Sequence, residues 1–180
     1  MTAILFTQAR RGTNEGPLKK GEEQMNERDR LAIEQACARL VTAFHVHIDA
    51  FEHDAILNLF APDAVWVHPM AGVLKGHKDF QGYLDSKSTK PQAMHITTNI
   101  LIEVLDENHA KGRAYYTFYY DGEGRDPAVL ETPMAVGQYR DEFVRTEQGW
   151  KFIRREPKNV FIRNDFGGVV VRKSDERPAA

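Results

Sequence analysis

Asp49 and the histidines of this chain are the residues whose types suit proton transfer. Asp49 lies in the stretch Phe44–His68, with His45 one helical turn before it. A histidine has an ordinary pKa of about 6.5, so it takes up a proton at little cost near neutral pH. A carboxylate bonded to one ring nitrogen fixes the tautomer and stabilises the imidazolium that forms. Asp49 is therefore either half of a catalytic pair or ordinary helix surface.

The position of Asp49 depends on a predicted helix from Arg28 to about Phe51. Apolar residues recur in it at helical spacing: Ile33, Cys37, Leu40, Val41, Phe44, Ile48 and Phe51. At about 100° per residue, Asp49 lies roughly 130° from the centre of that apolar stripe. The helix alone therefore places Asp49 on its polar flank, where the carboxylate is either solvated or at the rim of a cavity.

The remaining pattern predicts two more helices followed by strands. A second helix covers Asp54–Phe60 and stops before Pro62, Ala64–His68 is a strand, and a glycine-flanked turn or hairpin at Ala71–Gly76 precedes a third helix at Lys78–Ser88. Four longer strands follow: Ala93–Leu105, Lys111–Tyr120, Met134–Arg145 and Trp150–Ile162. Three helices packed on a curved, mostly antiparallel sheet form an α+β domain that can enclose a pocket.

Composition limits the organisation of the chain and its classes of partner. At 180 residues and 42% hydrophobic content, one domain is expected over 26–163, between a flexible extension at 1–25 and a tail at 164–180. Phe161–Val171 is apolar enough to cover a pocket mouth or a partner, and Met25 is a candidate start. A net charge of -2 with mixed signs argues against nucleic acid and membrane surfaces.

The sequence also bears on location and on metal chemistry. The opening MTAILF has no early positive charge and too short an apolar run for a signal peptide, and no run could cross a bilayer. We therefore expect a cytoplasmic protein. Cys37 is the only cysteine, which excludes an internal disulfide and a cysteine-built metal site. His45 and His47 diverge on the helix, so they are not a metal pair.

Three strings carry a family resemblance over roughly Asn26–Arg163. They are IDAFEHDAILNLFAPDAVW with the later KGHKDF, then AMHITTNILIEV, and VGQYRDEFVRTEQGWKF. With this order of elements, the chain resembles the SnoaL-like branch of the nuclear transport factor 2 superfamily, in the layout shared by scytalone dehydratase and lindane dehydrochlorinase. The resemblance implies a cone-shaped α+β domain and, because members often pair through the sheet, a homodimer or other homo-oligomer.

The resemblance also implies a catalytic dyad. An aspartate of the first helix falls on Asp49, and the proton-abstracting histidine falls on His95. A second histidine of the dehydratase falls on Tyr120, and its asparagine falls on Tyr139, so we do not expect the dehydratase's own activity or substrate. Strand alternation places His95 with Thr97 and Asn99, opposite Ile96, Ile100, Ile102 and Val104.

We therefore predict a cofactor-independent lyase or isomerase acting on a hydrophobic cyclic molecule, with Asp49, His95 and Tyr120 as catalytic residues. Tyr116 or Tyr120 would donate to a developing oxyanion or leaving group. The alternative is a non-catalytic binding domain, or an accessory subunit like the β subunits of aromatic-ring dioxygenases.

Other residues have plain structural interpretations beside functional ones. We expect His45 at the helix surface, His77 at the surface start of the third helix, and His68 either as an edge residue or facing the cavity. Tyr139, Asp141 and Arg145 suit cross-strand ion pairing. The expected ligand contacts are Tyr116, Phe118, Trp66, Phe60, Met94, Tyr139 and His68, whereas Tyr115 and Tyr119 face away.

Overall fold

The computed structural model describes residues 25–164, which contain the predicted domain. The predicted N-terminal extension and C-terminal tail fall outside the described residues, apart from their innermost positions. The elements in chain order are α1 (Glu27–Asp49), α2 (His53–Asn58), β1 (Phe60–His68), β2 (Gly72–Lys75), α3 (Gly76–Asp85), β3 (Gln92–Val104), β4 (His109–Asp121), β5 (Ala135–Thr146) and β6 (Gly149–Ile162). Among residues 25–164, no helix combines the length and apolar character needed to span a membrane.

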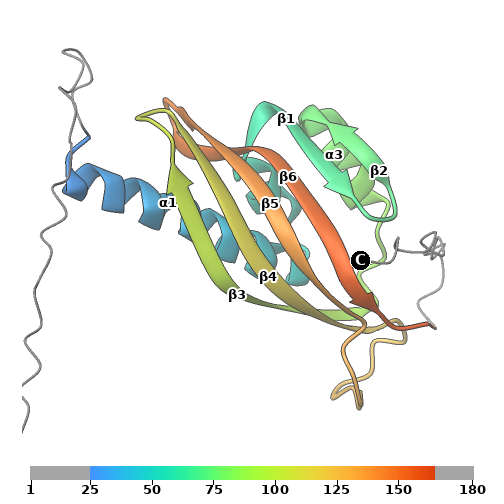
Figure 1. Ribbon diagram of the computed structural model, residues 1–180. Helices are drawn as coiled ribbons and strands as arrows, with labels where there is room; N and C mark the ends of the chain where they lie inside the picture. The colour runs from blue at the N-terminus through green and yellow to red at the C-terminus, as the bar shows by residue number, and fades with distance from the viewer. Residues whose placement is uncertain (1–24, 165–180) are drawn as a thin grey trace, which may run out of the picture.

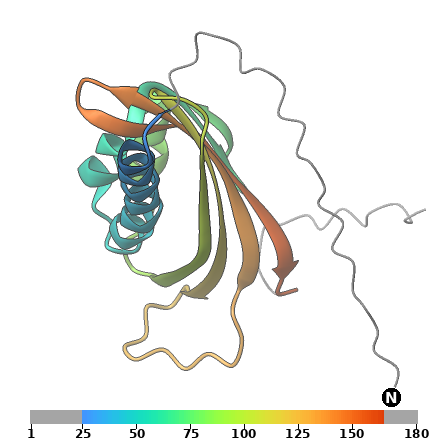
Figure 2. The ribbon, with the colours of Figure 1, turned by 60° about the vertical axis from the view of Figure 1, so that its left-hand side comes forward.

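One curved sheet contains all six strands, in the order β2-β1-β6-β5-β4-β3. The neighbouring pairs are antiparallel except β1 and β6, which run parallel. The helices lie on one side of the sheet, and α1 runs along it (Figures 1 and 2). This arrangement confirms the predicted α+β class, with helices packed on a curved, mostly antiparallel sheet.

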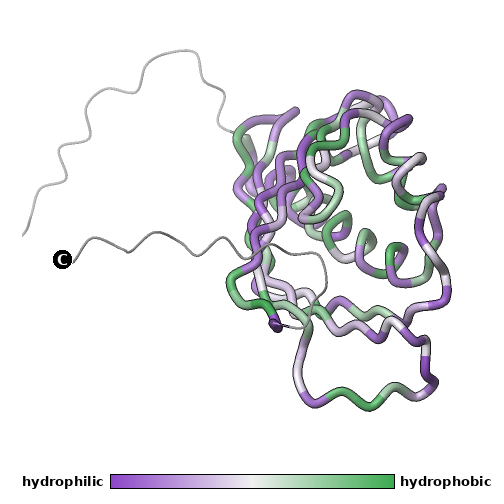
Figure 3. The backbone as a smooth tube through the Cα atoms, turned by 90° about the vertical axis from the view of Figure 1, so that its right-hand side faces the viewer, coloured by the Kyte–Doolittle hydropathy of each residue, from purple (hydrophilic) through white to green (hydrophobic). Residues whose placement is uncertain are grey.

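α1 begins where Asn26 caps it, since the Asn26 side chain accepts a hydrogen bond from the backbone N–H of Asp29 at 2.9 Å. Its buried face packs against β3 and β6. The alternation of hydrophobic and hydrophilic residues along the helices and strands can be followed in Figure 3. The main core lies between the helices and the sheet and includes Cys37, Val41, Phe44, Phe60, Phe80, Phe143 and Phe152.

The second predicted helix is wrong at its end. α2 stops at Asn58, and Phe60 is the first residue of β1. The chain leaves the helix because the backbone N–H of Phe152, in β6, donates to the Leu59 carbonyl at 2.9 Å, and Phe60 then pairs with Phe152. Pro62 falls in the irregular part of this pairing, where its missing N–H costs no ladder bond. The predicted hairpin after His68 is confirmed as the β1–β2 pair.

β3 contains a bulge that changes which residues face the interior. Its pairing with β4 shifts between Thr98 and Leu101, and Asn99 there has a φ of 52°. The predicted alternation therefore fails beyond Thr98. Ile96 faces outward, whereas Ile100 and Ile102 pack on the core from the same face that carries His95.

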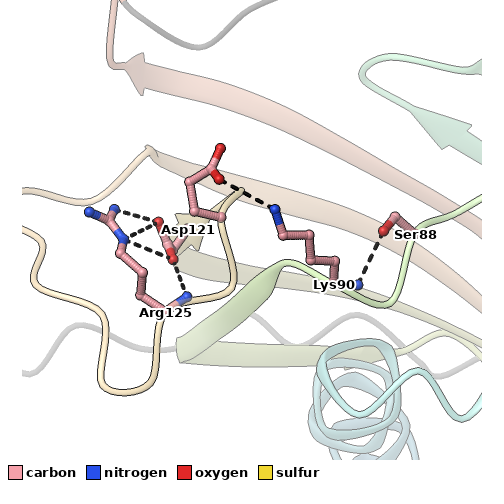
Figure 4. Close-up of polar contacts among 5 residues, drawn as sticks. Ser88, Lys90, Asp121 and Arg125 are labelled. Carbon is pink, nitrogen blue, oxygen red and sulfur yellow. Dashed lines mark hydrogen bonds and ion pairs between the residues drawn. The ribbon is translucent and has the colours of Figure 1, made fainter.

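Two connections meet at one end of the sheet, where β3 begins and β4 ends. Lys90, in the α3–β3 connection, forms an ion pair with Glu123 at 3.3 Å (Figure 4). Asp121 accepts hydrogen bonds from the guanidinium and the backbone N–H of Arg125, and these hold the start of the β4–β5 connection (Figure 4).

Candidate active site

Asp49 binds His95 through both oxygens of its carboxylate. Oδ1 lies 2.6 Å from His95 Nδ1, and Oδ2 lies 2.7 Å from the backbone nitrogen of the same residue. The two side chains are largely shielded, at 19% exposed for Asp49 and 16% for His95. β3 is an edge strand of the sheet, so its outward N–H groups have no strand partner, and Asp49 satisfies one of them. The structure thus brings together the two residues that the resemblance pairs, on the polar flank of α1.

The position of Asp49 in α1 also needs this partner. Asp49 is the last residue of α1, where the helix dipole disfavours a negative charge. The two short hydrogen bonds from His95 compensate for that position. Because a carboxylate only accepts hydrogen bonds, His95 Nδ1 must carry the hydrogen and its Nε2 keeps a lone pair. The ring is held in place by Phe118, which stacks on it with centroids 4.3 Å apart.

His45 is not the surface residue that the sequence suggested. It is buried, and its ring lies 5.1 Å from the ring of His95. Its Nε2 lies 3.3 Å from the guanidinium of Arg155, which can only donate, so Nδ1 carries the hydrogen and faces the Val41 carbonyl and the Thr97 hydroxyl. Burial, with the positive charge of Arg155, lowers the pKa of His45 far below its ordinary value. His45 is therefore a neutral neighbour of the dyad.

Arg155, in β6, connects His45 in α1 to Asp141 in β5. It is fully buried and forms an ion pair with Asp141 at 2.9 Å, directly across the β5–β6 ladder. Its guanidinium lies 3.8 Å from the ring centroid of Tyr139 and 4.3 Å from that of Phe44. The predicted cross-strand pairing of Asp141 is thus present, whereas Arg145 is exposed and outside it.

A cavity of about 420 Å³ opens beside the dyad, within the usual size range of small-molecule sites. Its walls come from the end of α1, from β1, from α3 and from the inner faces of the sheet. The lining is mostly apolar and aromatic, and includes Phe44, Ile48, Trp66, Leu84, Phe118, Met134 and Tyr139. The Asp49–His95 pair is set into this apolar surface.

Two further polar pairs line the cavity. Tyr116 donates its hydroxyl hydrogen to Asn159 Oδ1. His68 Nε2 lies 2.6 Å from the hydroxyl oxygen of Tyr83. The expectation that Tyr116 donates to a substrate oxygen therefore needs correction, because Asn159 already takes its hydrogen.

Six predicted site residues besides the dyad line the cavity: Tyr116, Phe118, Tyr120, Trp66, Tyr139 and His68. Two predicted ligand contacts lie elsewhere. Phe60 is packed in the main core, and Met94 is 62% exposed on the opposite face of β3. Met94 precedes His95, and successive residues of a strand point to opposite faces, so the two cannot share the cavity. His77, predicted at the surface, is half-buried against the Phe60 carbonyl at 3.1 Å.

The lining residues that were not predicted include three with polar side chains that bear on the chemistry: Tyr83, Lys87 and Asn159. Tyr83 and Lys87 are four residues apart, so they share one face of the helix predicted at Lys78–Ser88, a spacing that could have linked them, although α3 itself ends at Asp85. No comparable signal distinguishes Asn159 in β6. Among residues 25–164, no three His, Cys, Asp or Glu side chains come close enough to hold a metal ion.

Comparison with known families decides the classification. Residues 29–156 match the sequence profile of the SnoaL-like domain. The chain belongs to the SnoaL-like family. No curated protein matches the chain in sequence.

Solved structures share the fold of this SnoaL-like protein. A candidate scytalone dehydratase from Novosphingobium aromaticivorans is 22% identical with a TM-score of 0.66, and the match covers 85% of this chain and 98% of that one. The type 2 hexachlorocyclohexane dehydrochlorinase LinA is 18% identical with a TM-score of 0.66, covering 77% and 92%. A candidate aromatic ring hydroxylase from N. aromaticivorans is 22% identical with a TM-score of 0.60, covering 73% and 91%. At these identities the likeness shows a common fold.

Proposed function

We propose that this protein is a cofactor-independent lyase or isomerase that removes a proton from carbon in a hydrophobic cyclic molecule. His95 is the general base, and Asp49 orients it and stabilises its imidazolium. The observation that carries the proposal is the double hydrogen bond from Asp49 to His95 at the wall of an apolar cavity. It leaves Nε2 as the one ring nitrogen of His95 with a lone pair to accept a proton.

The proposed reaction follows from the lone pair on His95 Nε2. His95 Nε2 takes the proton, and the electron pair of the C–H bond forms a carbon–carbon double bond. In an elimination the leaving group departs with its bonding pair, whereas in an isomerisation the π pair of an existing double bond is displaced and takes up the returning proton at another carbon. The imidazolium is stabilised because Asp49 lies 2.6 Å from Nδ1. The mostly apolar lining of the cavity suits a hydrophobic substrate.

Proton abstraction can be tested before the natural substrate is known. The ketone 2-tetralone, a bicyclic compound with acidic C–H bonds, would be incubated with the protein in D₂O and deuterium incorporation followed by NMR. γ-Hexachlorocyclohexane, suggested by the dehydrochlorinase among the similar structures, would be assayed for chloride release. We expect at least one compound to react, and His95→Gln to abolish the reaction.

The control is His109→Gln, because His109 is exposed at the start of β4 and, within residues 25–164, its ring forms a polar contact only with Asp106. It should react like the unmodified protein. If His95→Gln reacts as fast as the unmodified protein, His95 is not the base. If both compounds bind and neither reacts, the protein is a binding domain, and the catalytic proposal is wrong.

A further inference from the structure

The His68–Tyr83 pair has a defined direction. His68 Nδ1 accepts hydrogen bonds from the backbone N–H groups of Met70 and Ala71, both at 3.2 Å. A nitrogen that accepts two N–H groups cannot carry a hydrogen itself, so the hydrogen of the neutral ring lies on Nε2. Burial, with the charge of Lys87, lowers the pKa of His68 to about 4, which keeps the ring neutral. His68 Nε2 therefore donates to the Tyr83 oxygen, 2.6 Å away.

Tyr83 consequently keeps its own hydrogen for another partner. Burial raises the pKa of Tyr83 above its usual range, so the hydroxyl stays protonated. A hydroxyl that receives a hydrogen bond is a better donor, because linked hydrogen bonds polarise one another. Tyr116 differs, since its hydrogen is bonded to Asn159. Tyr83 thus offers a donor to the same cavity in which His95 offers a base.

Lys87 adds a positive charge beside this donor. It lies four residues after Tyr83, just past the end of α3, lines the same cavity, and its Nζ is 4.3 Å from the centroid of the Tyr83 ring. Partial burial lowers the pKa of Lys87. Within the described part of the chain it forms no ion pair, whereas Lys90, three residues on, pairs with Glu123 (Figure 4). An anionic oxygen in the cavity would supply the counter-charge that Lys87 lacks.

We propose that Tyr83 and Lys87 form an oxygen-binding subsite, and that the substrates are cyclic carbonyl compounds whose oxygen binds there. His68 is a positioning residue that directs the Tyr83 hydrogen into the cavity. This inference rests on the proposed function: when His95 takes a proton from the carbon next to the carbonyl, the C–H pair forms a C=C bond and the carbonyl π pair moves to oxygen. Tyr83 and Lys87 stabilise the resulting enolate oxygen.

Ligand binding tests the subsite without catalysis. 2-Naphthoate is a flat apolar molecule with an anionic oxygen, and naphthalene-2-carboxamide is a neutral molecule of nearly the same shape. By calorimetry at neutral pH, we expect the unmodified protein to bind 2-naphthoate at least about tenfold more tightly. Lys87→Met should remove this preference, and Tyr83→Phe should weaken both probes. Lys90→Met, the matched control on an exposed lysine, should change neither.

The binding preference for 2-naphthoate can be measured independently of the proposed catalysis by His95. His95→Gln should keep the preference for 2-naphthoate, so a failed base and a failed subsite give different outcomes. Equal affinity for the two probes, no binding of either, or a preference that survives Lys87→Met would each overturn the subsite.

The hydrogen positions can be observed directly. In ¹⁵N-labelled protein at neutral pH, NMR of the histidine rings should show the Nε2–H tautomer for His68 and the Nδ1–H tautomer for His95. A His68 ring with its hydrogen on Nδ1 would mean that Tyr83 donates to His68 and has no hydrogen for a ligand, and would refute this assignment.

Discussion

Replacing Asp49 with asparagine should prevent His95 from acting as a base while leaving the fold intact. The amide of an asparagine has one oxygen, where the carboxylate has two that accept from His95 at 2.6 and 2.7 Å. If that oxygen keeps the bond to the backbone N–H, the amide NH₂ faces Nδ1 and donates to it. The imidazole hydrogen then moves to Nε2, the atom that must accept the proton. In catalytic triads the same change lowers kcat by about 10⁴-fold, because the wrong tautomer results.

Measuring the free energy of unfolding distinguishes the change of the His95 tautomer from damage to the fold. Asparagine replaces both hydrogen bonds, so the free energy of unfolding should fall by no more than about 1.5 kcal/mol. Asp49→Ala should cost more, about 1–3 kcal/mol, because it leaves the His95 backbone N–H without a partner. Urea unfolding measures both values. Asp63→Asn, at an exposed aspartate in β1, is the control and should change neither stability nor rate.

Deuterium incorporation into 2-tetralone, or chloride release if that is the active reaction, measures the rate. ¹⁵N NMR measures the His95 tautomer independently. An Asp49→Asn protein that reacts within about tenfold of the unmodified one would refute the tautomer mechanism, which requires a far larger loss. A His95 ring that keeps its hydrogen on Nδ1 in the variant would refute it equally.

Three further changes test the packing around the site. Arg155→Met should lower the free energy of unfolding by about 3–5 kcal/mol, because it leaves the Asp141 carboxylate buried without its partner, and adding Asp141→Leu should recover much of the loss in urea unfolding. Gly137→Ala would place a Cβ 2.6 Å from the Tyr116 hydroxyl and should cost about 1–3 kcal/mol, measured in the same way; unchanged stability would contradict the close packing. Lowering the pH from about 6.5 to 4 should destabilise the fold by up to about 3 kcal/mol through His68, since its pKa of about 4 means that only the unfolded chain takes up the proton in that range. A His68→Gln protein should lose less stability over the same pH range, and an equal slope would contradict this assignment.

The order of elements could be predicted because it depends on local patterns. Alternating β-branched and aromatic residues identified β3 to β6 within a few residues of their ends. The end of α2 could not be predicted in the same way. Phe60 continues the apolar helical spacing, and only its pairing with Phe152, about ninety residues later, takes it into a strand.

The burial of His45 was beyond the reach of a helical pattern. A helix can bury a residue outside its main apolar stripe when a polar partner lies inside the fold. For His45 that partner is Arg155, a residue of β6 that is itself buried. A lone sequence does not indicate which arginine of a strand will turn inward, because Arg154 and Arg155 are adjacent and identical in type.

The face of β3 shows why the composition of the site was only partly predictable. Strict alternation would put His95 and the later isoleucines of the strand on opposite faces. The bulge at Asn99 inserts an extra residue. One face of β3 therefore carries His95 before the bulge and core residues from Ile100 onward. Without the bulge, strict alternation would put Leu101 and Glu103, in place of Ile100 and Ile102, on the face that carries His95.

Hydrogen-bond direction, finally, depends on main-chain groups that the sequence does not reveal. His95 and His68 line one cavity, yet their rings should hold their hydrogens on different nitrogens. At His95 the carboxylate of Asp49 takes the Nδ1 hydrogen, whereas at His68 two backbone N–H groups occupy Nδ1. One histidine is thereby made an acceptor toward the cavity, and the other directs the hydrogen of Tyr83 into it. The same residue type can therefore serve as the proposed base at one position and as a donor to Tyr83 at the other, because the chain around each ring differs.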